Sequence, residues 1–464
     1  MGKVAFIQPK CLFNAYSYAG LPLIGPIYLG TIVKRAGYQV RIAAEYASEV
    51  YSEKNNELAP WIEDMDVIGI SALTPTTSRA YQIADAIKER YPQKKIIIGG
   101  PHATFMVDEA LRHADAVVVG EAEEVITSVI TNGNGKRVVQ GTLVPNLDDL
   151  PFPDFSLLDY QIPTRKYSPI ISSRGCPYNC TFCSVTAMFG GKYRFRSPDN
   201  VVEELKQRVR LGYRKFFFYD DNFGASKSRT KRFLERCLEE KLKFKWVAET
   251  RVDIAKDDEL LRLIAKTNCR SLLIGFESVN PETLRIFNKK QELQDIRECI
   301  RKLRQYHIGI HGMFVLGADA DEPATLRNTI SFCKKNHIDT AQFGILVPLP
   351  GTKLFQDLEK NNRLLTRDWS LYDGTHVVFA PFKMSALELQ KNVLRCYKRF
   401  YTLLRLKYFI FSRVLLKRWA RDNHGFMRYL KDLSNRAEKM LRDTRHALKR
   451  TVGSGLDGAT GKQG

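Results

Sequence analysis

Short apolar runs alternate with stretches of helical spacing through the first 140 residues of the chain. The runs are four or five residues long and rich in Val, Ile and Ala, which is typical of strands buried on both faces. Strands that alternate with crossover helices indicate a parallel sheet covered by helices, as in a Rossmann-like α/β domain. The predicted strands are Val4–Gln8, Gln39–Ala43, Val67–Ser71, Lys95–Ile98 and Ala116–Val119, and the predicted helices are Ile27–Ala36, Thr77–Tyr91 and Phe105–His113.

Six further β-like runs, separated by helical stretches, occupy residues 162–385. Such a series predicts a parallel barrel or partial barrel, (β/α)6, in which chemistry gathers at the carboxyl ends of the strands. The predicted strands are Ser168–Ser173, Lys215–Tyr219, Lys245–Glu249, Ser271–Phe276, Gly309–Leu316 and Thr340–Val347. The predicted helices between them include Pro198–Leu211, Ser228–Glu239, Asp257–Ala265, Leu293–Tyr306 and Ala324–Asn336.

Composition sets the boundaries between these parts. Prolines lie among acidic residues in the segment 141–161, and proline stiffens a connector while preventing regular structure. We therefore expect a Rossmann-like domain at 1–140, a linker at 141–161 and a barrel at 162–385. Beyond these, we expect a basic helical region at 386–452 and a disordered, glycine-rich tail at 453–464.

Three of the nine cysteines fall within eight residues, directly after the first predicted barrel strand. Cys176, Cys180 and Cys183 have the spacing C-x3-C-x2-C, which lets three thiolates of a short loop converge on an iron–sulfur cluster. A four-iron cluster with three protein ligands keeps one iron open for a small molecule. A structural zinc site would need a fourth Cys or His nearby, and the next cysteine, Cys237, is more than fifty residues away. A disulfide framework is not expected in a large chain without a secretion signal.

This cysteine loop, with Phe182 just before its last cysteine, resembles the signature of the radical SAM superfamily. The resemblance covers the barrel region and implies a six-unit partial barrel, a [4Fe–4S] cluster on the three cysteines, and S-adenosylmethionine (SAM) bound to the open iron. It also implies that SAM is cleaved reductively and that the resulting 5′-deoxyadenosyl radical attacks an unactivated C–H bond. An electron donor of the flavodoxin or ferredoxin type would supply the electron.

Polar residues at the carboxyl ends of the predicted barrel strands meet the needs of SAM. An acidic residue would accept from its ammonium group, Arg251 would pair with its carboxylate, and Glu277 with Ser278 would hold its ribose hydroxyls. Taken singly, each could instead be a helix cap, as Asp257 before an apolar helix shows. The SAM candidates are Phe182, Asp220, Asp221, Arg251, Glu277, Ser278 and Gly317.

Small and polar residues also end the predicted strands of the first domain, which resembles the cobalamin (B12)-binding domain found in front of many radical SAM proteins. The resemblance rests on Ser71-x-Leu73 and Gly99-Gly100, and paired glycines let backbone approach a bulky ligand. The Asp-x-His-x-x-Gly loop of that domain is missing, because residues 9–20 contain no histidine. Either cobalamin binds without a protein ligand from below, or the domain keeps the fold without the cofactor. The cobalamin candidates are Ser71, Leu73, Gly99, Gly100, Gly120 and Glu121.

The net charge of +21 is concentrated near the C-terminus, where residues 391–450 carry +14. Within 400–419 an apolar stripe runs from Tyr401 through Tyr408 and Phe411 to Trp419, bordered by Lys and Arg. Three interpretations compete: a helix packed on the barrel, a helix in an anionic membrane surface, and an RNA-binding segment. No apolar run reaches transmembrane length. We expect a cytoplasmic protein that contacts the inner membrane surface through residues 400–450, with nucleic acid a weaker alternative.

These features together predict a cobalamin-dependent radical SAM methyltransferase for a lipid-like or other small-molecule substrate. One alternative is a radical SAM enzyme that forms or rearranges C–C bonds with a cofactor-free B12-like domain. Another is an RNA-modifying enzyme such as the methylthiotransferases, but those carry additional cluster cysteines near the N-terminus, where this chain has only Cys11.

Overall fold

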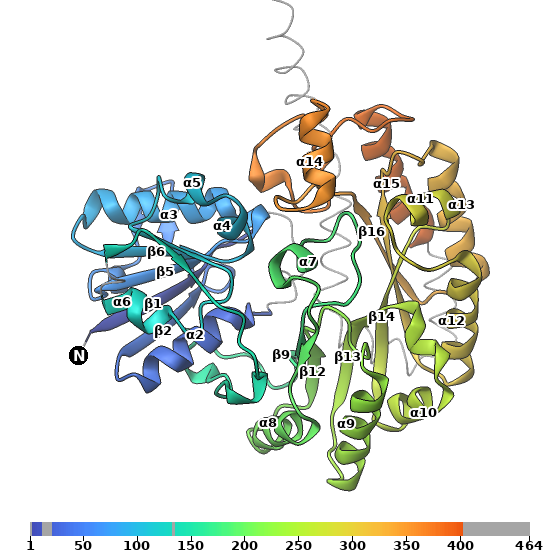
Figure 1. Cartoon of the computed structure of the whole chain (residues 1–464), viewed down its shortest axis with the longest axis horizontal. Helices are drawn as coiled ribbons and strands as arrows, with labels where there is room; N and C mark the ends of the chain where they lie inside the picture. Colours follow the sequence, from blue (N-terminus) through green and yellow to red (C-terminus); the bar gives the residue numbers. More distant parts are fainter. Residues whose placement is uncertain (1, 12–20, 132–134, 402–464) are drawn as a thin grey trace, which may run out of the picture.

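The computed structural model describes residues 2–11, 21–131 and 135–401 of the 464-residue chain. Two α/β units lie side by side, the N-terminal one in blue to teal and the second in green to orange (Figure 1). The expected loop at 12–20 and most of the expected apolar stripe, together with the tail at 453–464, fall outside the described residues. Within those residues, no helix is long and apolar enough to cross a membrane.

The N-terminal unit is a six-stranded parallel sheet in the order β2-β1-β5-β6-β7-β8, which confirms the predicted Rossmann-like arrangement. Its central strands are buried because helices cover both faces, and two separate apolar clusters fill the two interfaces. The strands are β1 (Lys3–Gln8), β2 (Gln39–Ala44), β5 (Val67–Ser71), β6 (Lys95–Gly99), β7 (Ala116–Val119) and β8 (Val138–Gln140), beside a hairpin of β3 (Tyr51–Ser52) and β4 (Glu57–Leu58). The helices are α2 (Ile24–Arg35), α3 (Thr77–Arg90), α4 (Pro101–Phe105), α5 (Val107–Ala110) and α6 (Ile126–Thr131).

The prediction of a single helix over Phe105–His113 was wrong. The chain instead makes the two short helices α4 and α5, separated by Met106 with non-helical dihedral angles. Phe105 lies close against Gly351 of the second unit, and Met106 packs on the apolar core of that unit. Packing against a distant part of the chain therefore overrides the local helical spacing.

The second unit is a parallel half-barrel in the order β16-β15-β14-β13-β12-β9, with helices on its outer face, as predicted. The strands are β9 (Ser168–Ile170), β12 (Lys215–Phe218), β13 (Lys245–Thr250), β14 (Cys269–Glu277), β15 (Gly309–Leu316) and β16 (Thr340–Ile345). The helices are α8 (Pro198–Arg210), α9 (Lys227–Glu239), α10 (Asp258–Lys266), α11 (Pro281–Ile286), α12 (Leu293–Gln305), α13 (Pro323–Lys335), α14 (Lys353–Lys360) and α15 (Ala386–Phe400). Asp257 caps α10 through the Leu260 N–H at 2.9 Å, which confirms the capping interpretation.

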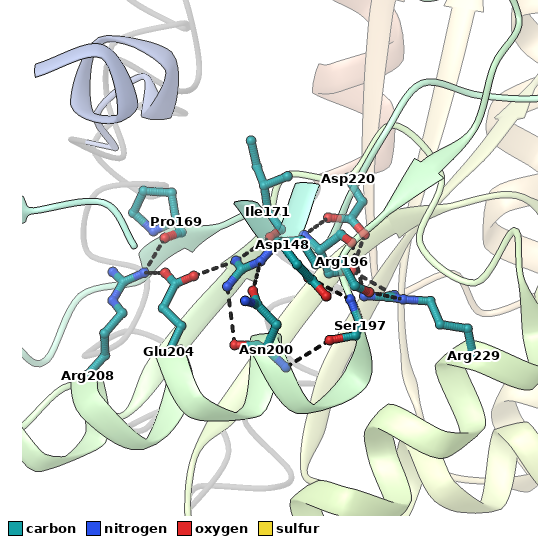
Figure 2. A network of polar contacts seen from close by, with 11 residues as sticks. Asp148, Pro169, Ile171, Arg196, Ser197, Asn200, Glu204, Arg208, Asp220 and Arg229 are labelled. Atoms are coloured by element: carbon teal, nitrogen blue, oxygen red, sulfur yellow. Dashed lines mark hydrogen bonds and ion pairs between the residues drawn. The ribbon is translucent and has the colours of Figure 1, made fainter. Parts of the chain in front are cut away.

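Three buried arginines donate hydrogen bonds to the free edge of β9 and to the two residues that follow it (Figure 2). Arg208 on α8 donates to the Pro169 carbonyl and Arg196 to the Ile171 carbonyl, at 2.5 and 2.9 Å. Arg229 on α9 donates to the Ser172 carbonyl at 3.0 Å. An unpaired strand edge is a template for association with other chains, so these contacts protect the barrel where it stays open.

The opposite edge strand, β16, is covered by α15, the first helix of the expected basic region. The N–H groups of Ala341 and Phe343 donate to the hydroxyls of Tyr401 and Tyr397, at 2.8 and 3.0 Å. Phe400 is fully buried in the barrel core. The described start of the C-terminal region therefore packs on the barrel.

Candidate functional site

The cysteine loop leaves the carboxyl end of β9 between the strands of a small hairpin, β10 (Ser173–Arg174) and β11 (Arg194–Phe195), and contains α7 (Ser184–Phe189). Asp220, at the end of β12, accepts hydrogen bonds from the Ser172 N–H and the Ser173 hydroxyl, both at 2.7 Å. The next residue, Asp221, accepts from the Gly175 N–H at 2.8 Å. Adjacent carboxylates thus hold the chain immediately before Cys176.

The three cysteines of this loop are free thiols set close enough to influence one another electrostatically. Burial raises the pKa of Cys176, and it raises the pKa of Cys183 to about 12. No group of three Cys, His, Asp or Glu side chains in the described part of the chain is arranged to hold a single metal ion. Three thiols on one short loop are the protein ligands that a four-iron cluster with one open iron requires. The donor set therefore suits the predicted [4Fe–4S] group.

The second half of the loop is tied to residues 287–289, which follow α11 (Pro281–Ile286). The Thr181 N–H donates to the Phe287 carbonyl at 3.1 Å, and Asn288 Nδ2 donates to the Asn179 carbonyl at 2.7 Å. The ring of Phe182 packs on that of Phe287, with centroids 4.8 Å apart. The loop is therefore held at both of its ends by neighbouring barrel segments.

The two SAM candidates at the end of β12 differ in their surroundings. Asp220 is 1% exposed, and both of its oxygens already accept hydrogen bonds from the serines before the loop. Asp221 is exposed as a residue. Its carboxyl group is nevertheless surrounded by protein atoms, and this desolvation raises its pKa to about 6. Of the pair, Asp221 is the carboxylate that a bound ligand can reach.

Arg251, at the end of β13, lies against the cysteine loop, while the other SAM candidates stand further along the sheet. Glu277 has a left-handed backbone (φ 58°) and pairs with Lys289 at 2.6 Å. Ser278 is fully buried and accepts from the Asn280 N–H at 3.0 Å. Gly317 has φ 109°, and a Cβ there would lie 2.6 Å from Leu389 of α15. The structure thus brings Phe182, Asp221 and Arg251 to the loop, and places Gly317 against α15.

Lys289 was missed at the sequence level. It is buried, pairs with Glu277 and offers its carbonyl to Arg251. A lysine in a polar run after a short helix looks like a surface residue. Only the fold of 287–289 over the cysteine loop reveals its position.

The carboxyl ends of β5, β6 and β7 hold most of the cobalamin candidates. Ser71 pairs with Gly99 in the sheet register, and Leu73 begins the turn before α3. Gly100 has φ 101°, and a Cβ on it would lie 2.8 Å from the Ala72 carbonyl. A Cβ on Gly99 would meet nothing closer than the Val118 carbonyl at 3.7 Å, so the protein leaves room beside that residue. A glycine without a side chain at the end of a strand lets a large ligand approach the backbone closely.

Gly120, the cobalamin candidate at the end of β7, has φ 83°, and its N–H donates to the Thr104 hydroxyl at 3.0 Å. Glu121, the last of the candidates, lies in a buried joint between the two units. Its carboxylate accepts from Arg194 and from the Val144 N–H at 2.7 Å, and it lies 3.3 Å from Arg174. Glu123 pairs with Arg174 at 2.6 Å. The turn after β7 is thereby fixed to the hairpin that frames the cysteine loop.

A second joint lies at the carboxyl end of β6. Trp369, which follows α14, donates through Nε1 to Glu109 at 2.9 Å and packs edge-on against His102, with ring centroids 4.8 Å apart. His102 is fully buried, with Nδ1 beside Thr74 and Nε2 beside Glu109. Loops from the carboxyl ends of the N-terminal sheet thus contact loops from the carboxyl ends of the half-barrel, so the two candidate cofactor regions lie on facing sides.

Comparisons with known proteins agree with this arrangement. The radical SAM superfamily matches residues 170–330, and the B12-binding domain family matches residues 15–130. The chain is 33% identical over 348 residues to a bacteriochlorophyllide d C-12(1)-methyltransferase of Chlorobaculum tepidum, covering 72% of this chain and 75% of that protein. It is 26% identical over 404 residues to a hopanoid C-3 methylase of Methylococcus capsulatus, covering 81% and 76%. The fold resembles that of the cobalamin-dependent SAM radical enzyme OxsB, with a TM-score of 0.65 at 15% identity over 97% of this chain and 81% of that one.

The chain belongs to the radical SAM superfamily, in the group with an N-terminal B12-binding domain that includes cobalamin-dependent methyltransferases. The predicted family and enzyme class are therefore confirmed, and a [4Fe–4S] cluster, SAM and cobalamin are the cofactors of this group. Enzymes of this superfamily need an external reductant.

Proposed function

We propose that this enzyme transfers a methyl group to an unactivated carbon of a lipid-like substrate. The supporting observation is the pair of joints that turn the carboxyl ends of the B12-type sheet toward those of the half-barrel. When bound, the cluster with SAM would supply radical chemistry, and cobalamin would supply the methyl group.

The chain's own residues would bind and orient these groups. Cys176, Cys180 and Cys183 would hold the cluster, and Asp221 would accept from the ammonium group of SAM. Gly99 and Gly100 would let cobalamin approach the backbone closely, and His102 would not ligate it because its side chain is buried in the domain joint. An electron donor of the flavodoxin or ferredoxin type would supply the electrons.

The first test is cluster loading. Cys176→Ala, Cys180→Ala and Cys183→Ala should each remove the cluster and abolish SAM cleavage, because each removes one of three ligands. Iron, sulfide and 5′-deoxyadenosine are measured after anaerobic reconstitution, with Cys237→Ala as a control thiol that lies buried in the barrel core. Retention of a full cluster in any loop variant contradicts the assignment.

The methyl-transfer step is tested by its products. The anaerobic, reduced enzyme with SAM, cobalamin and a lipid extract should release 5′-deoxyadenosine and S-adenosylhomocysteine in equal amounts. It should also form a product 14 mass units heavier than the substrate, the mass added by a CH₂ group. 5′-Deoxyadenosine without S-adenosylhomocysteine would instead indicate bond formation or rearrangement without methyl transfer.

The lipid-like class is supported by the hopanoid methylase among the relatives and by the +14 charge of residues 391–450. Each basic residue near an anionic leaflet contributes about 1 kcal/mol of binding free energy. Full-length protein should therefore float with anionic vesicles and less with neutral ones, and a chain ending at Tyr401 should lose this preference. The truncation belongs after Tyr401 because α15 is part of the barrel. Equal flotation of both chains would contradict membrane contact through the residues after Tyr401.

A further inference from the structure

Arg251 occupies a position that the SAM-binding prediction did not foresee. Its side chain is buried at 5% exposure, and each of its three nitrogens has a protein neighbour. Nε donates to Asp253 at 3.3 Å, Nη2 donates to the Lys289 carbonyl, and Nη1 lies 4.0 Å from the Sγ atom of Cys180. The guanidinium is therefore already engaged by the protein.

The cysteine loop encloses the same guanidinium from a further side. The ring of Tyr178 lies over it, with the Arg251 Cζ atom 3.6 Å from the ring centroid, well inside the range of cation–π contacts. The Tyr178 hydroxyl donates to Asp253 at 3.3 Å. Tyr178, Asp253 and Arg251 thus form one unit, whose cation points at the middle cysteine of the loop.

The charges around this unit do not cancel the electrostatic effect of the Arg251 guanidinium on the sulfur of Cys180. Asp253 is partly exposed, with a side-chain exposure of 25%, so solvent screens its charge. The nearby Lys289 ammonium is balanced by Glu277 at 2.6 Å. Cys180 is only 9% exposed, so the interaction of its sulfur with the guanidinium crosses little water.

We propose that Arg251 is a positioning residue that fixes Cys180 and raises the reduction potential of the [4Fe–4S] cluster, an inference that rests on the proposed function. A cluster gains negative charge when it is reduced, so a fixed cation and an N–H donor at a ligand sulfur favour the reduced form. The contacts with Tyr178 and the Lys289 carbonyl hold the cation at that distance. Arg251 thereby makes the cluster easier to reduce by an external donor.

The test compares Arg251→Lys and Arg251→Met with the wild type. The control is Arg301→Met, which removes an arginine with 60% exposure that pairs with Glu298 on α12. After anaerobic reconstitution, iron and sulfide content, the cluster midpoint potential and the SAM dissociation constant are measured. Wild-type protein that takes up no iron would contradict the proposed function itself, before any variant is compared.

Arg251→Met should lower the reduction equilibrium constant about tenfold, which is about 59 mV for a one-electron couple. Arg251→Lys should lower the reduction equilibrium constant less, because lysine keeps the positive charge. Lysine cannot, however, contact both Cys180 and the Lys289 carbonyl. Arg301→Met should match the wild type. If Arg251→Met retains no iron, its potential cannot be measured. The proposal is then tested by whether the midpoint potential of Arg251→Lys lies below that of the wild type. Wild-type potentials in the variants overturn the proposal, and a weakened SAM affinity alongside them would assign Arg251 to the SAM carboxylate.

Discussion

Neighbouring residues at the carboxyl ends of the half-barrel strands have different structural roles, and the sequence alone does not distinguish these roles. Asp220 and Asp221 are identical in type, yet one is buried under three hydrogen bonds and the other is exposed. The three cluster cysteines could be identified because their spacing is itself the signal. The contacts of Arg251 with Cys180 and Lys289, and of Glu121 with Arg194, could not be predicted, since these partners are 38 to 73 residues away in the chain.

Gly99 and Gly100 offer a test of the proposed cobalamin site at the residue scale. Gly99→Val should weaken cobalamin binding at least tenfold with little change in thermal stability, because its Cβ would meet Val118 only at ordinary contact distances of 3.7 and 3.8 Å. Gly100→Val should destabilise the apoprotein, since its backbone has φ 101° and a Cβ would meet the Ala72 carbonyl. Equilibrium binding followed by absorption, together with thermal unfolding, separates the two effects. Unchanged cobalamin affinity in Gly99→Val would show that the ligand does not approach there.

At the scale of elements, the pattern of apolar residues was sufficient to predict the strands whose structure depends only on their burial. All eleven predicted strands are present with small differences at their ends, because central parallel strands are apolar throughout. The short edge strand β8 was not predicted, since three residues with Val138 at 41% exposure carry no clear pattern. The broken helix at Met106 depends on contacts with the other domain, which local spacing cannot encode.

The arginine-capped edge of β9 depends on one glutamate. Glu204 is 1% exposed and pairs with Arg196 and with Arg208 at 2.5 and 3.3 Å. Glu204→Gln should lower the free energy of unfolding by about 3 to 5 kcal/mol, because it leaves two buried guanidinium groups without a counter-charge. Urea unfolding measures this loss. Glu203→Gln, at an exposed position of the same helix, should change it by less than about 0.5 kcal/mol. An equal effect of the two substitutions would contradict a structural role for the network.

The whole molecule consists of two sheets joined through the turns at their carboxyl ends. One joint is ionic, between Glu121, Glu123 and the two hairpin arginines, and the other is aromatic, between Trp369 and His102. The order of domains could be predicted from the sequence, because each carries its own pattern. Their relative placement could not, since it is set by buried pairs more than seventy residues apart.

The ionic joint should control how firmly the units are held together. Glu121→Gln removes the negative charge that faces both Arg194 and Arg174, so limited proteolysis should cut residues 141–161 faster. Glu89→Gln, at an exposed position on α3 of the same domain, serves as the control. Cluster content should stay at the wild-type level in both variants. A cleavage rate equal to that of the wild type would mean that the aromatic joint is sufficient.

The caps on the two barrel edges also become available at different times during synthesis. Of the arginines that cover this edge, Arg208 and Arg229 belong to α8 and α9, and Arg196 lies just before α8. All three leave the ribosome soon after β9. The hydroxyls that cover β16 belong to Tyr397 and Tyr401, more than fifty residues after the strand begins. A nascent chain therefore passes through a period with one protected and one bare edge, in which association with other chains is favoured. The demand for chaperones should end only when residue 401 has emerged.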